Sequence, residues 1–236
     1  MNNLNKIALN YHSSEFKDKF IEDESQVYTL NWIRSILSEG DSILEMGYGE
    51  GIVTNFLSEL NINLDVIEGA ELLIDKARIR HKDITFIHSM FENFAPNKKY
   101  DVIICTHVLE HVDDSIVILN LMHGWLKDDG KIILIVPNAE SIPRQLSVIM
   151  GIQENLDDLS QRDLIVGHQR VYSPNLLEKH IKNANLKIHI KRGFFLKTLP
   201  NSMMIKFDIK LIRSLNKISE NIPFKLLANL AYVVKK

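Results

Sequence analysis

The sequence lacks the features of an exported or membrane-bound protein. Its 236 residues include one cysteine, Cys105, so no disulfide can form within the chain, and a reducing compartment such as the cytoplasm is expected. The opening residues have no apolar core of the kind found in a signal peptide. No apolar run approaches the roughly 20 residues that a membrane-spanning helix needs. We therefore expect a cytoplasmic protein without a membrane span.

An excess of charge of one sign is also missing. The formal net charge is -2, which argues against the broad basic face of a nucleic-acid-binding protein. The basic clusters at 78–82 and 206–217 are typical of solvated helix faces. The sequence contains no internal repeat and no clustered Asp and His residues at metal-ligand spacing, so no metal is expected. A small molecule is the expected partner, and the oligomeric state stays open.

Short β-branched runs alternate with helical patterns over residues 40–136. This alternation predicts a parallel sheet with helices on both faces. The predicted strands are 42–46, 63–68, 84–87, 100–105, 131–136, 185–190 and 231–234. Helices are predicted at 52–60, 72–77 and 115–126, at the Ser173-Pro174 cap, and over about 203–219, where Met204, Leu211, Leu215 and Ile218 form the apolar side.

A glycine-rich turn joins the first strand to the first helix. Its glycines are Gly47, Gly49 and Gly51, and glycine permits a positive φ and a close approach of ligand to backbone. The following helix offers free N–H groups. Glu68 ends the next strand, where a carboxylate can accept both hydroxyls of a ribose. These features together predict a nucleoside-containing cofactor.

Two cofactors compete for this turn. The dinucleotide pattern G-x-G-x-x-G would place its third glycine at position 52, which is occupied by Ile52. An NAD-dependent oxidoreductase is therefore disfavoured but stays an alternative. So does a purely structural turn between strand and helix.

The spacing G-x-G-x-G, preceded by Glu45, resembles motif I of class I S-adenosylmethionine-dependent methyltransferases. Residues 101–112, with their V-L-E-H-V core, closely resemble the fourth-strand motif of small-molecule methyltransferases of the ubiquinone-biosynthesis type. The resemblance covers about residues 40–136, and a weaker one continues through 167–173. Residues 194–203 look like a segment of methyltransferases from bacterial surface-polysaccharide clusters.

The resemblance implies an α/β fold with a doubly wound, mostly parallel, seven-stranded Rossmann-like sheet and an antiparallel last strand. It implies one domain: a helical cap (1–39), a cofactor-binding core (40–136), a lid insert over the substrate (137–172) and the C-terminal part of the sheet (173–236). It also implies S-adenosylmethionine as the cofactor. The expected cofactor-binding residues are Glu45, Gly47, Tyr48, Gly49, Gly51, Glu68, Gly69, Met90, Phe91, Thr106, His107 and Tyr11.

Methyl transfer from a sulfonium is an in-line displacement, so the protein contributes mainly alignment. A hydroxyl acceptor must also lose a proton, for which a histidine is suited, whereas an ionised oxygen needs no base. His107 is the first candidate base, followed by His168 and His111. For each of them, a structural histidine paired with the backbone or Glu110 is the alternative.

The expected acceptor is an oxygen of a small metabolite, such as a nucleotide-linked sugar or a capsule-decoration precursor. A quinone precursor or an amine stays open. Candidates to hold an anionic group on the acceptor are Arg144, Arg170, Arg192 and Lys197, and for each of them an ordinary surface position is the favoured alternative. A cofactor-binding subunit that activates a partner enzyme is a non-catalytic alternative. A nucleic-acid methyltransferase usually has an N-P-P-Y type motif after the fourth strand. This chain has Thr106-His107-Val108-Leu109 there, which disfavours a nucleic-acid acceptor.

Overall fold

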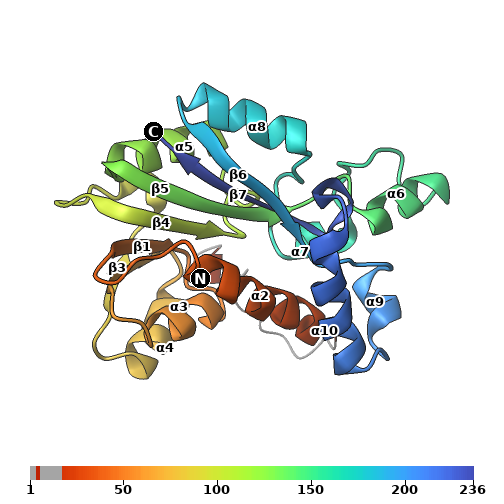
Figure 1. Cartoon of the computed structure of the whole chain (residues 1–236), viewed down its shortest axis with the longest axis horizontal. Coiled ribbons are helices and arrows are strands. Elements are labelled where there is room, and N and C mark those ends of the chain that lie inside the picture. Colours follow the sequence, from red (N-terminus) through yellow and green to blue (C-terminus); the bar gives the residue numbers. More distant parts are fainter. Residues whose placement is uncertain (1–3, 6–17) are drawn as a thin grey trace.

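The computed structural model describes residues 4–5 and 18–236, so the prediction for Tyr11 lies outside the described residues. A seven-stranded sheet in the order β3-β2-β1-β4-β5-β7-β6 forms the centre of the molecule (Figure 1). Its strands are β1 (Ser42–Met46), β2 (Asn63–Glu68), β3 (Thr85–His88), β4 (Tyr100–Thr106), β5 (Leu126–Pro137), β6 (Lys187–Phe194) and β7 (Asn229–Lys235).

The direction of the strands confirms the predicted fold class. β1 pairs in parallel with β2 and β4, β2 with β3, and β4 with β5. The last strand, β7, lies between β5 and β6 and is antiparallel to both. The sheet is therefore an α/β, mostly parallel sheet with an antiparallel last strand.

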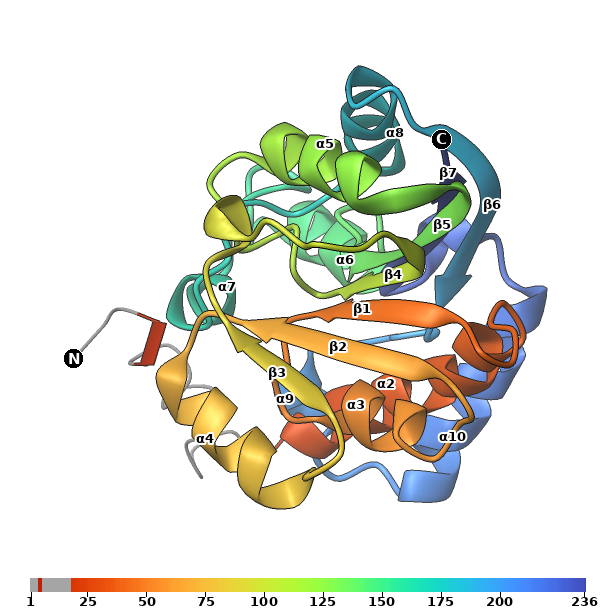
Figure 2. The same cartoon turned by 90° about the vertical axis from the view of Figure 1, so that its left-hand side faces the viewer.

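Helices cover both faces of this sheet (Figure 2). On one face lie α5 (Ser115–Trp125) and α8 (Pro174–Asn183), and on the other lie α2 (Lys19–Arg34), α3 (Ile52–Leu57), α4 (Glu71–Arg80) and α10 (Ile209–Ile218). β4 shows why the sheet is covered twice: Val102 and Ile104 pack with the α2–α3 side, whereas Ile103 and Cys105 pack with the α5–α8 side. Successive side chains of a strand point to opposite faces, so a continuous apolar run requires cover on both.

The predicted helix over 203–219 is wrong in its extent and in its apolar side. It is two helices, α9 (Asn201–Met204) and α10, and the backbone N–H of Lys210 donates to the Asp208 side chain at the start of the second. Of the predicted apolar side, Met204 is buried and Leu215 packs against the same cluster as the buried Ile212. Leu211 and Ile218 are instead 44% and 49% exposed. Helical spacing counted across the break at 205–208 does not predict the buried side of α10, because the chain between the two helices is not helical and the faces of α9 and α10 are not in register.

Smaller differences lie at element ends. β6 begins at Lys187 instead of 185, because Asn185 has a φ of 56° and turns the chain there. β5 begins at Leu126, which pairs with Tyr100, so the strand starts well before the predicted 131. α3 ends at Leu57, three residues before the predicted end, in a turn closed by Leu60 N–H to the Leu57 carbonyl.

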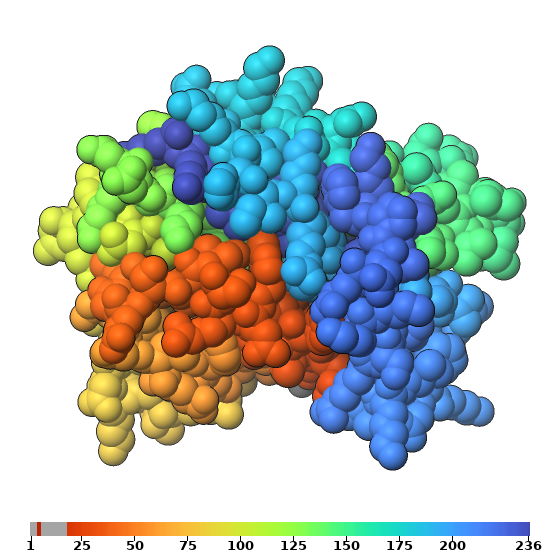
Figure 3. All heavy atoms as spheres, in the orientation of Figure 1, coloured from red at the N-terminus to blue at the C-terminus, as the bar shows by residue number. Residues whose placement is uncertain are grey.

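The segment 137–172 carries two short helices, α6 (Ile142–Ile149) and α7 (Gln161–Ile165). Figure 3 shows α6, in green, protruding from the body of the molecule. α7 lies near the ends of the strands in Figure 1. None of the helices in the described parts of the chain is long and apolar enough to cross a membrane.

Candidate active site

A cavity of about 510 Å³ lies where β1, β2, β4 and β5 end. The carboxyl ends of parallel strands are where ligands bind in open α/β sheets. One part of its wall comes from the β1–α3 turn and the end of β2. The other part comes from α2, the loop after β4, the segment 137–172 and residues 195–201.

The glycine turn adopts the backbone that its sequence predicted. Gly47, Gly49 and Gly51 have φ values of 80°, 52° and 74°. A Cβ on Gly49 would meet no atom within 4 Å, and Gly49 lines the cavity. A Cβ on Gly51 would lie 2.6 Å from the Tyr48 hydroxyl. Gly49 therefore leaves room for a ligand, whereas Gly51, which is not part of the cavity wall, leaves room for Tyr48.

Two carboxylates stand beside this turn. Glu68 accepts hydrogen bonds from the backbone N–H groups of Tyr48 (2.9 Å) and Ala70 (2.7 Å), which fixes it at the cavity wall. Glu45 is 2% exposed and accepts a hydrogen bond from the Thr54 hydroxyl (2.7 Å). Burial raises the pKa of Glu45 to about 8, because an apolar surrounding disfavours the charged form.

Four other predicted cofactor-binding residues divide into two groups. Phe91 and Thr106 line the cavity. Met90 and Gly69 do not, although they are neighbours: a Cβ on Gly69 would lie 3.2 Å from the Met90 sulfur. The structure therefore brings only Phe91 of the predicted pair 90–91 to the cavity.

His107 follows β4 in a left-handed conformation, with a φ of 55°. This conformation is rare outside glycine, and such strain gathers at functional sites. Its backbone N–H donates to the Ile135 carbonyl (2.8 Å), and its ring Nδ1 lies 3.3 Å from Oε1 of Glu110. An acceptor beside Nδ1 favours the tautomer that carries its proton there and leaves Nε2 as a base.

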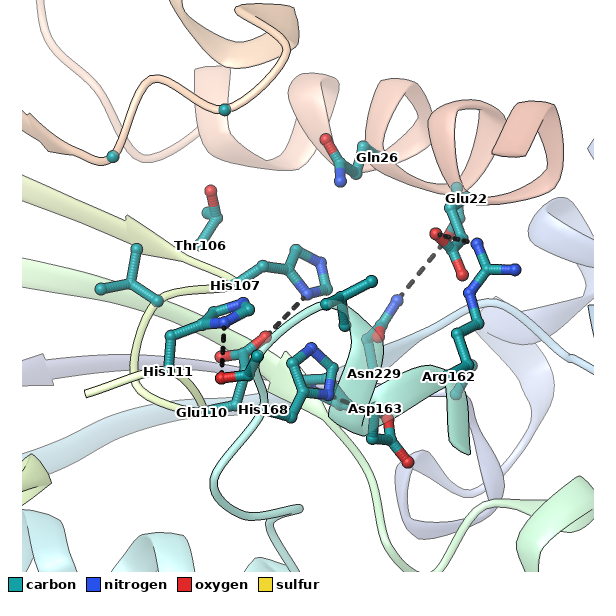
Figure 4. Close-up of a pocket in the computed structure, with 18 of the residues that line it drawn as sticks. Glu22, Gln26, Thr106, His107, Glu110, His111, Arg162, Asp163, His168 and Asn229 are labelled. Atoms are coloured by element: carbon teal, nitrogen blue, oxygen red, sulfur yellow. Dashed lines mark hydrogen bonds and ion pairs between the residues drawn. The ribbon is translucent and has the colours of Figure 1, made fainter. Parts of the chain in front are cut away.

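His111 and His168 complete a group of three histidines around Glu110 (Figure 4). Nδ1 of His111 lies 3.3 Å from the Gly167 carbonyl, and Nδ1 of His168 lies 2.9 Å from Oδ1 of Asp163. The two rings meet edge to face, with centroids 4.7 Å apart. All three predicted histidines therefore line one cavity.

Glu110 is the buried centre of this group, with an exposed fraction of 0%. Burial by itself would raise the pKa of Glu110, but His107, His111 and His168 outweigh it and hold the pKa below its ordinary value. Burial lowers the pKa of the His111 imidazole, and the negative charge of Glu110 opposes this shift. The arrangement therefore favours the ionised form of the Glu110 carboxylate.

The four cationic residues predicted to hold an anion lie in different places. Arg170 donates to the carbonyls of Leu109 (2.8 Å) and Asp113 (2.9 Å), and Arg192 stacks on the Phe194 ring; neither lines the cavity. Arg144 lines it but pairs with Asp163 (2.7 Å). Lys197 lines it and, among the described residues, has no carboxylate within 4.0 Å.

Sequence reasoning missed two residues of the site. Asp163 positions His168 and is itself held by Ser160 and Arg144. Burial would raise the pKa of Asp163, but these three partners together hold it well below the ordinary value. Glu22 lines the cavity from α2 and accepts a hydrogen bond from Asn201 (2.7 Å). Glu22 carries no local sequence signal, because Asn201 is 179 positions away in the chain. Asp163 does carry one, since Ser160 and Asp163 form a capping box at the start of α7.

Comparison with known proteins gives one consistent result. A family model described as a methyltransferase domain matches residues 24–190. The ubiquinone biosynthesis O-methyltransferase of Rickettsia felis is 24% identical over 178 residues, which cover 71% of this chain and 69% of that protein.

Two solved structures share the fold. An S-adenosylmethionine-dependent methyltransferase from Mesorhizobium loti matches with a TM-score of 0.64 and 13% identity, over 89% of this chain and 98% of that one. A Haloferax volcanii methyltransferase, solved in complex with the Trm112 methyltransferase activator, matches with a TM-score of 0.66 and 15% identity, over 98% and 97% of the two chains.

Proposed function

The chain belongs to the family of methyltransferase domains, and from this premise we propose that it transfers a methyl group from S-adenosylmethionine to an oxygen of a small, anionic metabolite. The observation that carries the proposal is the single cavity, in which the glycine turn and Glu68 share a space with His107 and Lys197. We call the part of the cavity lined by the glycine turn and Glu68 the cofactor half, and the part lined by His107 and Lys197 the acceptor half. The two must adjoin for a methyl group to pass directly from cofactor to acceptor.

S-adenosylmethionine is the cofactor, and it supplies a methyl group on a sulfonium that is already a good leaving group. The residues present fit it. Gly49 leaves open space beside the backbone, and Glu68 presents its carboxylate at the end of β2. Phe91 and Tyr48 add apolar surface for a purine. The N–H groups at the start of α3 are available to a polar ligand group.

In the acceptor half we assign the base to His107. Its Nδ1 faces Glu110, so Nε2 is the nitrogen that takes the proton from an acceptor hydroxyl. We assign to Lys197 the binding of the anionic group of the acceptor. Burial lowers the pKa of Lys197, with Arg162 and Arg144 adding to this and Glu22 opposing it, and a bound anion would stabilise its charged form.

The segment 137–172 is proposed as the lid over this half. It contributes Arg144, Asp163 and His168 to the cavity wall. A lid excludes water and holds the acceptor in line with the methyl group. The buried thiol of Cys105 agrees with a reaction in the cytoplasm.

Two acceptor classes deserve a direct test. The named activity of the Rickettsia felis relative favours a phenolic quinone precursor, whereas the resemblance of residues 194–203 favours a nucleotide-linked sugar. A carboxylate on the first or a phosphate on the second would each suit Lys197.

The test is turnover by the purified chain with S-adenosylmethionine and two acceptor panels, phenolic carboxylates and nucleotide sugars, read as S-adenosylhomocysteine formed. Titration calorimetry with S-adenosylhomocysteine and with NAD runs in parallel. Lys197→Ala should raise KM for the acceptor, whereas Lys187→Ala on β6, outside the cavity wall, is the matched control. Binding of NAD alone would refute the proposal. Cofactor binding without turnover of any acceptor until a partner is added would favour the non-catalytic alternative.

A further inference from the structure

One carboxylate and two imidazoles converge in the acceptor half in a way that the sequence did not predict. Glu110, His111 and His168 each offer one ligand atom, and these atoms lie within 4.8 Å of one another. Around an ion with bonds of roughly 2.1 Å, tetrahedral ligand atoms stand about 3.4 Å apart. Small side-chain movements would therefore close the three groups around an ion.

Glu110 has a further property that points to a ligand. Its side chain is 0% exposed, and within the described residues neither carboxylate oxygen accepts a hydrogen bond. The Nδ1 atom of His107 is an ion-pair neighbour at 3.3 Å from Oε1. Buried carboxylates are costly unless they are paired or bind a metal, so the remaining lone pairs of Glu110 call for a cationic partner.

The two histidines are arranged as metal-binding histidines usually are. A carbonyl and a carboxylate can only accept, so Nδ1 of His111 donates to Gly167 and Nδ1 of His168 donates to Asp163. Each ring then keeps the lone pair of Nε2. Hydrogen bonds of this kind set the tautomer and orientation of metal-ligating histidines. Asp163 is in turn held by Arg144 (2.7 Å) and Ser160 (2.6 Å).

We infer that Glu110, His111 and His168 bind a divalent transition-metal ion, of which Zn²⁺ is the representative, at the acceptor end of the cavity. Imidazole with carboxylate suits such ions better than Mg²⁺ or Ca²⁺. Three protein ligands leave a coordination position open, and all three residues line the cavity. A hydroxyl in that position would lose its proton to His107 more readily. Only this role in the reaction rests on the proposed function; the binding of the ion does not.

The experiment is metal titration of the full chain after removal of metals with EDTA, in the absence of cofactor. Calorimetry follows Zn²⁺, and the d–d absorption of Co²⁺ reports the ligand set. We expect one ion per chain. Glu110→Gln and His168→Ala should each weaken binding at least 100-fold, and Asp163→Asn by 10- to 100-fold. His189→Ala, an exposed histidine on β6, is the matched control and should bind as the wild type does.

Binding of S-adenosylhomocysteine by each variant shows that it is folded. Zn²⁺ affinity that is absent in the wild type, or unchanged in a folded Glu110→Gln variant, would overturn the inference. Loss of binding in His189→Ala would place the ion elsewhere and would also overturn it. Cofactor binding without metal binding leaves the proposed function standing and the metal site refuted. Metal binding without cofactor binding supports the site and refutes the function.

Discussion

Replacement of Gly49 by alanine tests the cofactor site with a matched control inside the same protein. Gly49 has a φ of 52°, and an added Cβ would meet no protein atom within 4 Å. Gly40 has a φ of 80° and also has nothing within 4 Å, but it lies before β1, away from the cavity. The two substitutions therefore impose similar backbone strain, and only one of them points into the cavity.

The strain can be given a size. An L-residue in the left-handed region costs about 1–2 kcal/mol. For a chain of 236 residues, this lowers the Tm by roughly 2–8 °C. We expect both Gly49→Ala and Gly40→Ala to show this loss. We expect only Gly49→Ala to lose affinity for S-adenosylhomocysteine, because its methyl group would occupy space beside the ligand. The expected loss is about 10-fold or more, which corresponds to about 1.4 kcal/mol or more of binding free energy.

The assay is calorimetric titration with S-adenosylhomocysteine, combined with thermal unfolding of the wild type and the two variants. Equal affinity in Gly49→Ala and the wild type would refute the placement of the ligand against the turn. An equal loss of affinity in Gly40→Ala would mean that strain is transmitted through β1, and would refute the argument from open space. Gly51→Ala should behave differently from both, because its Cβ meets the Tyr48 ring and stability should fall further.

Three further predictions concern the carboxylates and the base. Glu68→Ala should weaken S-adenosylhomocysteine binding by about 10- to 100-fold in titration calorimetry, because charged hydrogen bonds are lost; wild-type affinity would remove Glu68 from the cofactor site. His107→Ala should lower kcat by about 100-fold or more with nearly unchanged cofactor affinity, and unchanged turnover would show that the acceptor needs no base. The raised pKa of Glu45, about 8 against 4.5, means that its stabilising contribution is complete below pH 4.5 and is lost as the pH rises toward 8. Between pH 5 and pH 8.5, the free energy of unfolding measured in urea should therefore fall less in Glu45→Gln than in the wild type. An equal fall in the two proteins would contradict the raised pKa of Glu45.

Much of the fold could be predicted because its signals are local. The alternation of strands and helices, the apolar runs of β4 and β5 and the glycines of the first turn all lie within a few residues of one another. In each case the residues that give the signal are the same residues that form the strand, helix or turn. The boundaries that failed, at Asn185 and in 205–208, are places where a single turn residue or a helix break changes the phase of the pattern.

The acceptor half was harder to predict because its contacts are long-range. The rings of His111 and His168 lie edge to face, although the two residues are 57 positions apart in the sequence. Arg170 resembled an anion-binding residue by type, yet the fold uses it to hold carbonyls of the loop after β4. Only Lys197 of the four cationic candidates combines a place in the cavity wall with the lack of a carboxylate within 4.0 Å among the described residues.

The two halves of the cavity therefore depend on the sequence in different ways. The cofactor half is built from the β1–α3 turn and the end of β2, and the strands β1 and β2 pair side by side in the sheet. The acceptor half exists only when 167–170 lies on 109–113, where Gln169 N–H donates to the Glu110 carbonyl (2.8 Å) and Gly167 accepts from His111. A relative with 24% identity can share the first half through local motifs alone. Under the proposed function the second half sets acceptor choice, which would then follow from the contacts of Glu110, His168 and Lys197 more than from overall likeness.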